Sequence, residues 1–332
     1  MKVLHNIALK SYNSFRTQAM AKLFCKAQTP KELTDVLKEY LNEDKLILGS
    51  GYNLFFTKDY DGIVIKPEIK GITILSETNE SVEIEAGAAE DWDHFVAYCV
   101  EHTFAGIENL SLIPGSVGAA PIQNIGAYGA EVKDVITRVK TIDIETGEQI
   151  IFENRDCDFT YRNSIFKQTR RYVVTSVIFK LNKQFKYHEK YIDLNRKLKN
   201  IDNPSLAQVR DAVIRIRNQK LPDPALLPNA GSFFKNPILN QAEKSSLLQK
   251  LPHAPVYEIG DGQYKTSAAY LIEQAGYKGK RVGEVGTYEH HALIIVNYGT
   301  ENGQFIADFV QDIQDVVRIQ FGICLEPEVW IF

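Results

Sequence analysis

The sequence has few cysteines, no long apolar run and no excess of positive charge. Its four cysteines (Cys25, Cys99, Cys157 and Cys324) form no CxxC pair, so we expect small buried side chains in a reducing cytoplasm. No stretch approaches the roughly 18 apolar residues that span a bilayer, and the first residues do not form a signal peptide. A net charge of −4 argues against a surface that binds nucleic acid or membranes.

Three familiar site patterns are also absent. The chain contains no GxxxxGK[ST] phosphate loop, and in LGSGYNL the residue Leu54 stands where GxGxxG needs its third glycine. His290 and His291 are adjacent but lack the H-E-x-x-H spacing or a carboxylate triad, so we expect no metal site.

Ser232 and Lys235 have the Ser-x-x-Lys spacing of some acyl-transfer enzymes. The pair would share a face only on a helix, because residues i and i+3 of a strand point to opposite faces. Two phenylalanines, Gly231 and Pro237 favour a strand or turn here, and no companion Ser-Asp-Asn is present. The sequence therefore argues against a serine hydrolase.

Length and composition predict a globular protein of about two domains. Of its 332 residues, 44% are hydrophobic and 24% are charged. Helical patterns at 29–41 (with a capping box from Thr29 to Glu32) and at 204–219 occur among hairpins and an expected closing strand at 323–332. Because the helices and strands do not alternate regularly, we expect an α+β fold, with a boundary at the proline-rich segment near residue 221.

Two glycine-rich segments are candidates for ligand binding. The turn at 48–53 follows a strand and could present N–H groups to a phosphate, although a tight structural turn is the alternative. The segment 106–130 contains small residues that could lie against a planar ligand, with a compact structural loop as its alternative.

Charged candidates fall in three places. Arg162 could bind a carboxylate or form a surface ion pair. Arg217 and Lys220 lie at a helix end, where they could bind a diphosphate or cap the helix. Glu326 and Glu328 flank Pro327 and should face the same way on a strand, which suggests a site, with an exposed strand start as the alternative.

Taken in order, these segments resemble UDP-N-acetylenolpyruvoylglucosamine reductases, the flavoenzymes also called UDP-N-acetylmuramate dehydrogenases. The resemblance is carried by LGSGYNLFF, ENLSLIPGSVGAAPIQNIGAYGAE, YRNSIFK, KLPDP, NAGSFFKNP and LEPEV. The segment KYHEKYIDL further resembles the form with an extra tyrosine-bearing substrate loop.

The resemblance implies an FAD-binding domain of the vanillyl-alcohol-oxidase-like class, with lobes at 1–70 and 71–220. It also implies a smaller α+β substrate domain at 221–318, and a C-terminal strand at 319–332 that carries Glu328 back to the FAD region. The implied cofactor is FAD, with NADPH as co-substrate. We expect a cytoplasmic monomer that acts on a UDP-sugar nucleotide.

The resemblance implies that Ser232 donates the proton, while Arg162 and Glu328 stabilise the substrate carboxylate and the intermediate. Glu328 would then need a raised pKa. The cofactor-binding residues that the resemblance implies are Gly49, Ser50, Gly51, Tyr52, Asn53, Pro114, Gly115, Ser116, Gly118, Ala119, Gln123, Asn124 and Gly126. The substrate-binding residues that it implies are Tyr128, Tyr161, Tyr191, Arg217, Lys220 and Asn236. Tyr52 departs from the family pattern, which usually has serine there.

Two other functions share part of this pattern. A flavin oxidase or dehydrogenase acting on another alcohol or sugar would keep the FAD loops without needing Ser232, Arg162 and Glu328 together. A non-catalytic sugar-nucleotide binder would be colourless when purified.

Overall fold

The computed structural model describes residues 1–187 and 191–332. Contacts divide the chain into two compact units. Unit 1 comprises residues 1–7, 21–50 and 61–219, and unit 2 comprises residues 8–20, 51–60 and 220–332. The division joins the two expected FAD lobes in one unit and adds two N-terminal segments to the last third of the chain. The domain boundaries implied by the sequence stay a proposal.

Among the described residues, unit 1 contains three sheets, with strand orders β1-β2-β5-β3, β11-β10-β12-β7-β6 and β8-β9. Its strands are β1 (Val3–Ala8), β2 (Met20–Ala27), β3 (Lys45–Ile47), β5 (Tyr60–Pro67), β6 (Ile72–Glu77), β7 (Ser81–Gly87), β8 (Gly126–Ala127), β9 (Ala130–Glu131), β10 (Ile136–Asp143), β11 (Gln149–Glu153) and β12 (Tyr172–Asn182). Its helices are α1 (Pro30–Glu39), α2 (Trp92–Glu101), α3 (Ile165–Thr169), α4 (Ile192–Leu198) and α5 (Leu206–Lys220), with 3-10 turns η2 (Glu108–Leu110), η3 (Val117–Ala119), η4 (Val132–Asp134) and η5 (Asn154–Cys157).

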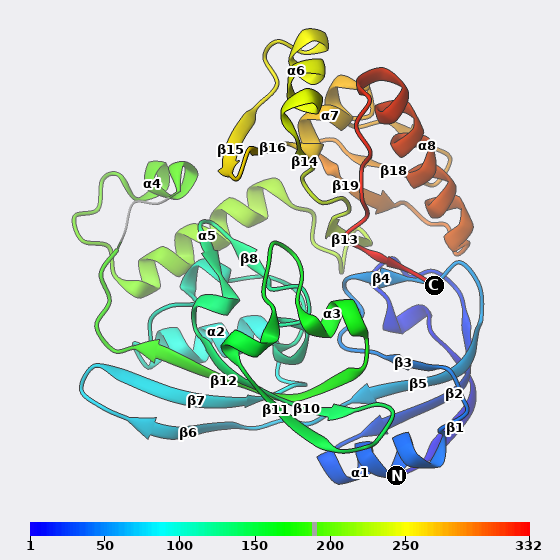
Figure 1. Cartoon of the computed structure of the whole chain (residues 1–332), viewed down its shortest axis with the longest axis vertical. Coiled ribbons are helices and arrows are strands. Elements are labelled where there is room, and N and C mark those ends of the chain that lie inside the picture. Colours follow the sequence, from blue (N-terminus) through cyan, green and yellow to red (C-terminus); the bar gives the residue numbers. More distant parts are fainter. Residues whose placement is uncertain (188–190) are drawn as a thin grey trace. The chain divides into compact units, whose positions relative to one another are not determined.

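The core of unit 1 forms where α2 covers the larger sheet (Figure 1). Trp92 and Phe95 of α2 are buried against Phe179 of β12, with ring centroids 5.0 to 6.1 Å apart. Asp91 caps the helix by accepting from the His94 N–H at 2.9 Å. This packing fixes the start of α2, beside which the glycine-rich 106–130 segment runs.

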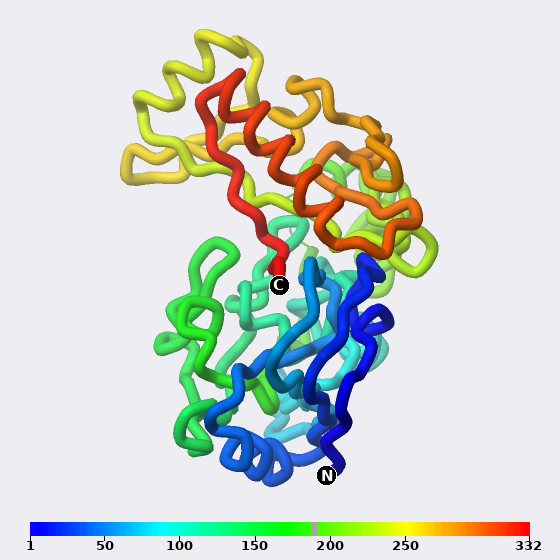
Figure 2. The backbone as a smooth tube through the Cα atoms, turned by 90° about the vertical axis from the view of Figure 1, so that its right-hand side faces the viewer, coloured from blue at the N-terminus to red at the C-terminus, as the bar shows by residue number. Residues whose placement is uncertain are grey.

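Unit 2 is built around the sheet β13-β19-β18-β17, with the smaller sheets β14-β16-β15 and β20-β4. Its strands are β4 (Leu54–Phe55), β13 (Asn229–Ser232), β14 (Ile238–Leu239), β15 (Val256–Gly260), β16 (Gln263–Thr266), β17 (Arg281–Val282), β18 (Val285–Tyr288), β19 (His291–Asn297) and β20 (Trp330–Ile331). Its helices are α6 (Gln241–Lys250), α7 (Ala268–Gln274) and α8 (Gly303–Phe321), with a 3-10 turn η1 (Lys10–Tyr12). The long helix α8 is the orange-to-red coil in Figure 2. It packs against β18, and its apolar face joins the core of this unit.

The expected α+β class is confirmed, and three local predictions are wrong. The closing strand is shorter than expected and is limited to β20, with a single isolated bridge between Pro327 and Phe234 before it. Cys324 is exposed rather than buried. Thr29 caps α1 as predicted, but the Glu32 carboxylate accepts from the Gln28 N–H at 2.7 Å, so Thr29 and Glu32 do not form a capping box.

Candidate functional site

The first glycine turn lies against the long loop within unit 1. A Cβ on Gly49 would lie 3.4 Å from Ser116 Oγ and 4.0 Å from the Cβ of Ala119. Lys66 Nζ donates to the Gly49 carbonyl at 3.1 Å, and burial lowers the pKa of this lysine. The structure thus brings together two segments that the sequence assigns separately to FAD.

Gly51 adopts a conformation that only glycine accommodates without strain. Its φ is +74°, and a Cβ there would lie 2.8 Å from the carbonyl carbon of Tyr12 and overlap the oxygen. Ser14 donates its N–H to the Gly51 carbonyl at 3.0 Å and its hydroxyl to the Tyr52 carbonyl at 3.3 Å. Residues 12–14 therefore hold the backbone of the turn, and the exposed side chain of Tyr52 is accommodated there.

Buried polar side chains hold the segment 8–20 in turn. Asn13 Oδ1 accepts from the N–H of Thr17 at 3.0 Å, and Asn13 Nδ2 donates to the Thr17 carbonyl at 3.1 Å. The Thr17 hydroxyl accepts from the Phe56 N–H at 3.2 Å. Asn13 and Thr17 are 4% and 0% exposed, so each of these hydrogen bonds satisfies a group that water cannot reach.

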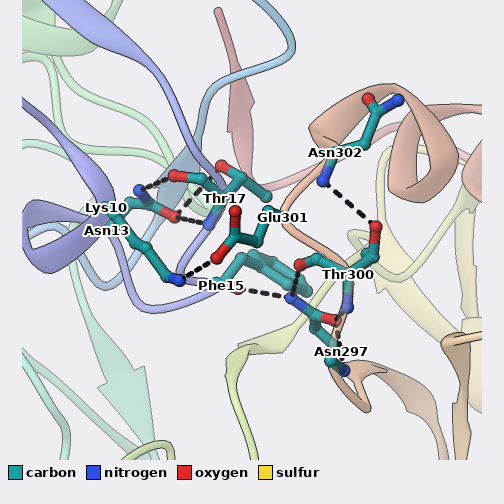
Figure 3. Close-up of polar contacts among 9 residues, drawn as sticks. Lys10, Asn13, Phe15, Thr17, Asn297, Thr300, Glu301 and Asn302 are labelled. Carbon is teal, nitrogen blue, oxygen red and sulfur yellow. Dashed lines mark hydrogen bonds and ion pairs between the residues drawn. The ribbon is translucent and has the colours of Figure 1, made fainter.

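Asn297, at the end of β19, joins this segment to the last third of the chain (Figure 3). Its Nδ2 donates to the carbonyls of Phe15 and Thr300, both at 2.7 Å. An ion pair between Lys10 and Glu301 lies beside it. The network fixes residues 12–14, and so supports the turn at Gly51.

This supporting segment was not among the residues predicted from sequence. The run SYNSFRT is rich in side chains that bond to nearby backbone groups, which is a signal for an ordered loop. Its partners at 297–301 are too distant in the chain to be found by local pattern.

Ser232 and Glu328 come from neighbouring stretches of unit 2. The Glu328 N–H donates to the Phe233 carbonyl at 2.7 Å. Asn53 brackets the same stretch, since its Nδ2 donates to the Glu328 carbonyl at 3.1 Å and its carbonyl accepts from the Trp330 N–H at 2.9 Å. Ser232 is exposed at the end of β13, whereas Glu328 is only 9% exposed. The turn residue Asn53 is therefore linked through backbone to two candidate catalytic residues.

Glu326 and Glu328 differ in exposure, although strand periodicity predicts that both face the same way. The side chain of Glu326 is 70% exposed and its carboxylate lies 2.5 Å from Lys235 Nζ. Ser232 ends a strand, as expected from the sequence, and the ammonium group that a hydrolase would need is paired with Glu326 instead.

Arg162 lies on a tight turn of unit 1, between Thr160 and Asn163, with a φ of +55°. Its Nη2 donates to the Gly126 carbonyl at 2.9 Å. Asn124 Nδ2 donates to the Thr160 carbonyl at 3.1 Å, which ties the turn to the long loop. The candidate carboxylate ligand is thus placed beside the predicted FAD segment 123–126.

Three of the predicted substrate residues form one cluster in unit 1. The rings of Tyr128 and Tyr191 meet edge to face with centroids 5.2 Å apart. Burial lowers the pKa of Arg217, and the neighbouring Tyr128 partly opposes this shift. Arg217 Nε donates to the Leu112 carbonyl at 3.1 Å. Residues 188–190 of the expected tyrosine-bearing loop lie outside the described residues.

The other predicted substrate residues are dispersed. Tyr161 is adjacent to Arg162, whose guanidinium carbon lies 5.7 Å from the centroid of the tyrosine ring. In unit 2, Asn236 Oδ1 accepts from the Ala268 N–H at the start of α7, at 3.0 Å. Lys220 ends α5 and is exposed.

We expect His291 to make the stability of the protein sensitive to acid. Burial, then the charges of Lys220 and Lys278, lower the pKa of His291 below its ordinary value. The unfolded chain therefore binds a proton at this histidine more tightly than the folded protein does. The contribution of neutral His291 to stability is fully present above about pH 6.5, and it declines as the pH falls below that value. We expect the melting temperature of the wild type to fall more between about pH 7 and 5 than that of His291→Gln.

Calorimetry across this pH range tests the prediction, with His290→Gln as the matched control because His290 is exposed. The control should keep the wild-type pH dependence. Equal slopes for the wild type and His291→Gln would show that another group is responsible.

Within residues 1–187 and 191–332, no helix is long and apolar enough to cross a membrane. The same residues contain no cluster of three or more His, Cys, Asp or Glu side chains that could hold a metal ion.

Comparisons with known proteins match both parts of the chain. Residues 21–153 match the family model of an FAD-binding domain. Residues 223–332 match that of the C-terminal domain of UDP-N-acetylenolpyruvoylglucosamine reductase. The expected combination of an FAD-binding domain and a second, smaller domain is confirmed.

Two curated relatives align over almost their whole length. The UDP-N-acetylenolpyruvoylglucosamine reductase of Flavobacterium johnsoniae is 45% identical over 99% of both chains. That of Amoebophilus asiaticus is 43% identical, again over 99% of both. The crystal structure of the Thermus caldophilus reductase has the same fold, with a TM-score of 0.72 at 22% identity, covering 100% of this chain and 99% of that one.

Proposed function

The chain belongs to the UDP-N-acetylenolpyruvoylglucosamine reductase family, and we propose that it reduces the enolpyruvyl ether of UDP-N-acetylglucosamine with NADPH. With its FAD-binding domain, it is an FAD-dependent oxidoreductase of peptidoglycan precursor synthesis. The product would be the lactyl ether, UDP-N-acetylmuramate. The observation that carries the proposal is the 45% identity over 99% of the chain.

The glycine-rich turns fit a flavin dinucleotide. Gly115 has a φ of +145°, and no described atom lies within 4 Å of the position that a Cβ would occupy. A ligand can therefore approach this backbone closely. We propose that the turn at 49–53 and the loop at 114–126 hold the FAD, with the Gly49–Ser116 contact as their junction.

Bound FAD, once reduced by NADPH, would supply hydride from its N5 to the β-carbon of the enolpyruvyl group. Negative charge then develops at the substrate α-carbon and spreads into the carboxylate. Ser232 would deliver the proton that completes the reduction at that carbon. Its exposed position at a strand end leaves the hydroxyl accessible to substrate.

Arg162 and Glu328 would stabilise this developing charge. A guanidinium offers a fixed set of donors for a carboxylate, and Arg162 is already oriented by the Gly126 carbonyl. Glu328 would assist only when protonated or linked through water, because an ionised carboxylate would repel the enolate. Its burial favours the protonated form, so we predict a raised pKa.

The family pattern implies further substrate contacts. We propose that Lys220 and Tyr191 meet the phosphates, with Tyr128, Tyr161, Arg217 and Asn236 nearby. The proposed substrate domain at 221–318 would bind the sugar nucleotide, and the enzyme would act as a monomer.

The flavin spectrum tests the proposed function directly. We expect the purified protein to be yellow, to bleach with NADPH under anaerobic conditions, and to regain its colour on addition of UDP-N-acetylglucosamine enolpyruvate. Bleaching without recovery on addition of this substrate would reject the proposal and favour another flavin dehydrogenase. UDP-N-acetylglucosamine, which lacks the enolpyruvyl group, is the control and should leave the reduced spectrum unchanged.

A further inference from the structure

Leu112 has a backbone conformation that leucine rarely adopts. Its φ is +58°, in the left-handed region where a Cβ crowds the backbone. Such a residue persists only where its surroundings hold it, and it then often marks a functional segment. Leu112 comes two residues before Pro114, where the proposed FAD-binding loop begins.

Charged side chains bind both polar groups of Leu112. Its N–H donates to Asp93 Oδ1 at 2.5 Å, and its carbonyl accepts from Arg217 Nε at 3.1 Å. Asp93 belongs to the first turn of α2 and Arg217 to the last turns of α5. The two helices therefore hold Leu112 together, α2 through its N–H group and α5 through its carbonyl group.

Arg210 keeps Asp93 in place. Its Nη1 and Nη2 lie 2.7 and 2.9 Å from the two carboxylate oxygens, a bidentate pair with side chains only 14% and 23% exposed. Burial by itself raises the pKa of Asp93, but the hydrogen bonds from Arg210 and the Leu112 N–H outweigh it and lower the pKa. Asp93 is therefore an ionised, oriented acceptor at neutral pH.

The loop that follows Leu112 is bonded along the start of α2. The backbone N–H of Trp92 donates to the Gly115 carbonyl at 3.1 Å. The N–H groups of Val117 and Gly118 donate to the carbonyls of Glu90 and Ala88, both at 2.9 Å. The direction in which the chain leaves Leu112 thus decides whether these bonds can form.

We propose that Asp93, Arg210 and Arg217 are positioning residues that hold Leu112 in its left-handed conformation and so keep residues 114–118 in their FAD-binding shape. The inference rests on the proposed function only in taking this loop as an FAD site. It gives Arg217 a role through the loop backbone, beside or in place of the substrate contact implied by the family pattern.

The test is FAD affinity, measured by fluorescence titration of full-length protein stripped of flavin. Asp93→Ala should raise the dissociation constant about 10- to 100-fold, the loss typical of removing a group that orients a ligand. Asp35→Ala, which breaks an exposed ion pair with Lys31 on α1, is the matched control and should not change it.

A second substitution separates positioning from simple packing. Glycine adopts φ values near +58° without strain, so Leu112→Gly should restore most of the affinity lost in Asp93→Ala. A merely structural ion pair between α2 and α5 would give no such rescue. Unchanged affinity in Asp93→Ala, or loss without rescue by Leu112→Gly, would overturn the inference.

Asp93→Asn keeps the shape of the side chain and an acceptor for the Leu112 N–H, and covers the case in which Asp93→Ala does not fold. It should weaken FAD binding less than Asp93→Ala, and a defect cured by Leu112→Gly supports the inference, whereas wild-type affinity or an uncured defect overturns it. A wild type that binds FAD but does not reduce the sugar nucleotide would reject the proposed function and leave this test valid.

Discussion

Ser232→Ala is expected to slow reduction of the enolpyruvyl substrate by about 10²- to 10⁴-fold, the loss expected for a positioned proton donor. Reduction of the flavin by NADPH should remain close to the wild-type rate, because no proton from Ser232 enters that half-reaction. Stopped-flow absorbance of the flavin measures each half-reaction separately.

Ser246→Ala is the matched control for this experiment. Ser246 is exposed on α6 of the same unit and is not among the proposed site residues, so its loss should change neither half-reaction. Wild-type turnover in Ser232→Ala would reject the proton-donor role. Slowing of both half-reactions together would indicate a disturbed flavin site instead.

Gly51→Ala is expected to destabilise the flavin-free protein and abolish flavin retention. The left-handed backbone alone costs about 1–3 kcal/mol with a Cβ present. The overlap with the Tyr12 carbonyl adds to that cost, because a backbone atom cannot move aside as a flexible side chain can. Urea unfolding of the flavin-free protein and the flavin content after purification measure the two effects.

Gly49→Ala provides the comparison, since it adds the same methyl group two residues earlier. The new Cβ would meet Ser116 Oγ at 3.4 Å, an ordinary contact, so the flavin-free protein should keep nearly its wild-type stability. If Gly51→Ala and Gly49→Ala unfolded at the same urea concentration, overlap with the Tyr12 carbonyl would not destabilise the protein.

The sequence predicts those features that depend on neighbouring residues. Thr29 at a helix start and the helical pattern at 204–219 are local signals, and the structure has α1 and α5 where these helices were expected. The glycine turns were found for the same reason. Their membership of one site came from the order of the segments, which resembles a known family, and not from any single turn.

Contacts between distant parts of the chain could not be read in this way. Asp93 and Arg210 are 117 positions apart, and nothing in the pattern around Leu112 indicates a left-handed leucine. The different exposures of Glu326 and Glu328 could not be predicted either, because Glu326 pairs with Lys235, 91 positions away, while Glu328 is buried, and the two residues look equivalent in sequence.

The make-up of unit 2 sets an order for folding during synthesis. Phe15 and Phe55 belong to the same apolar core as Phe233, and the final strand β20 pairs with β4. At about 5–20 residues per second, the ribosome takes on the order of 15–60 s to make the remaining chain. Segments 8–20 and 51–60 must wait that long for their partners, so an isolated fragment starting at residue 220 would lack part of its own interior.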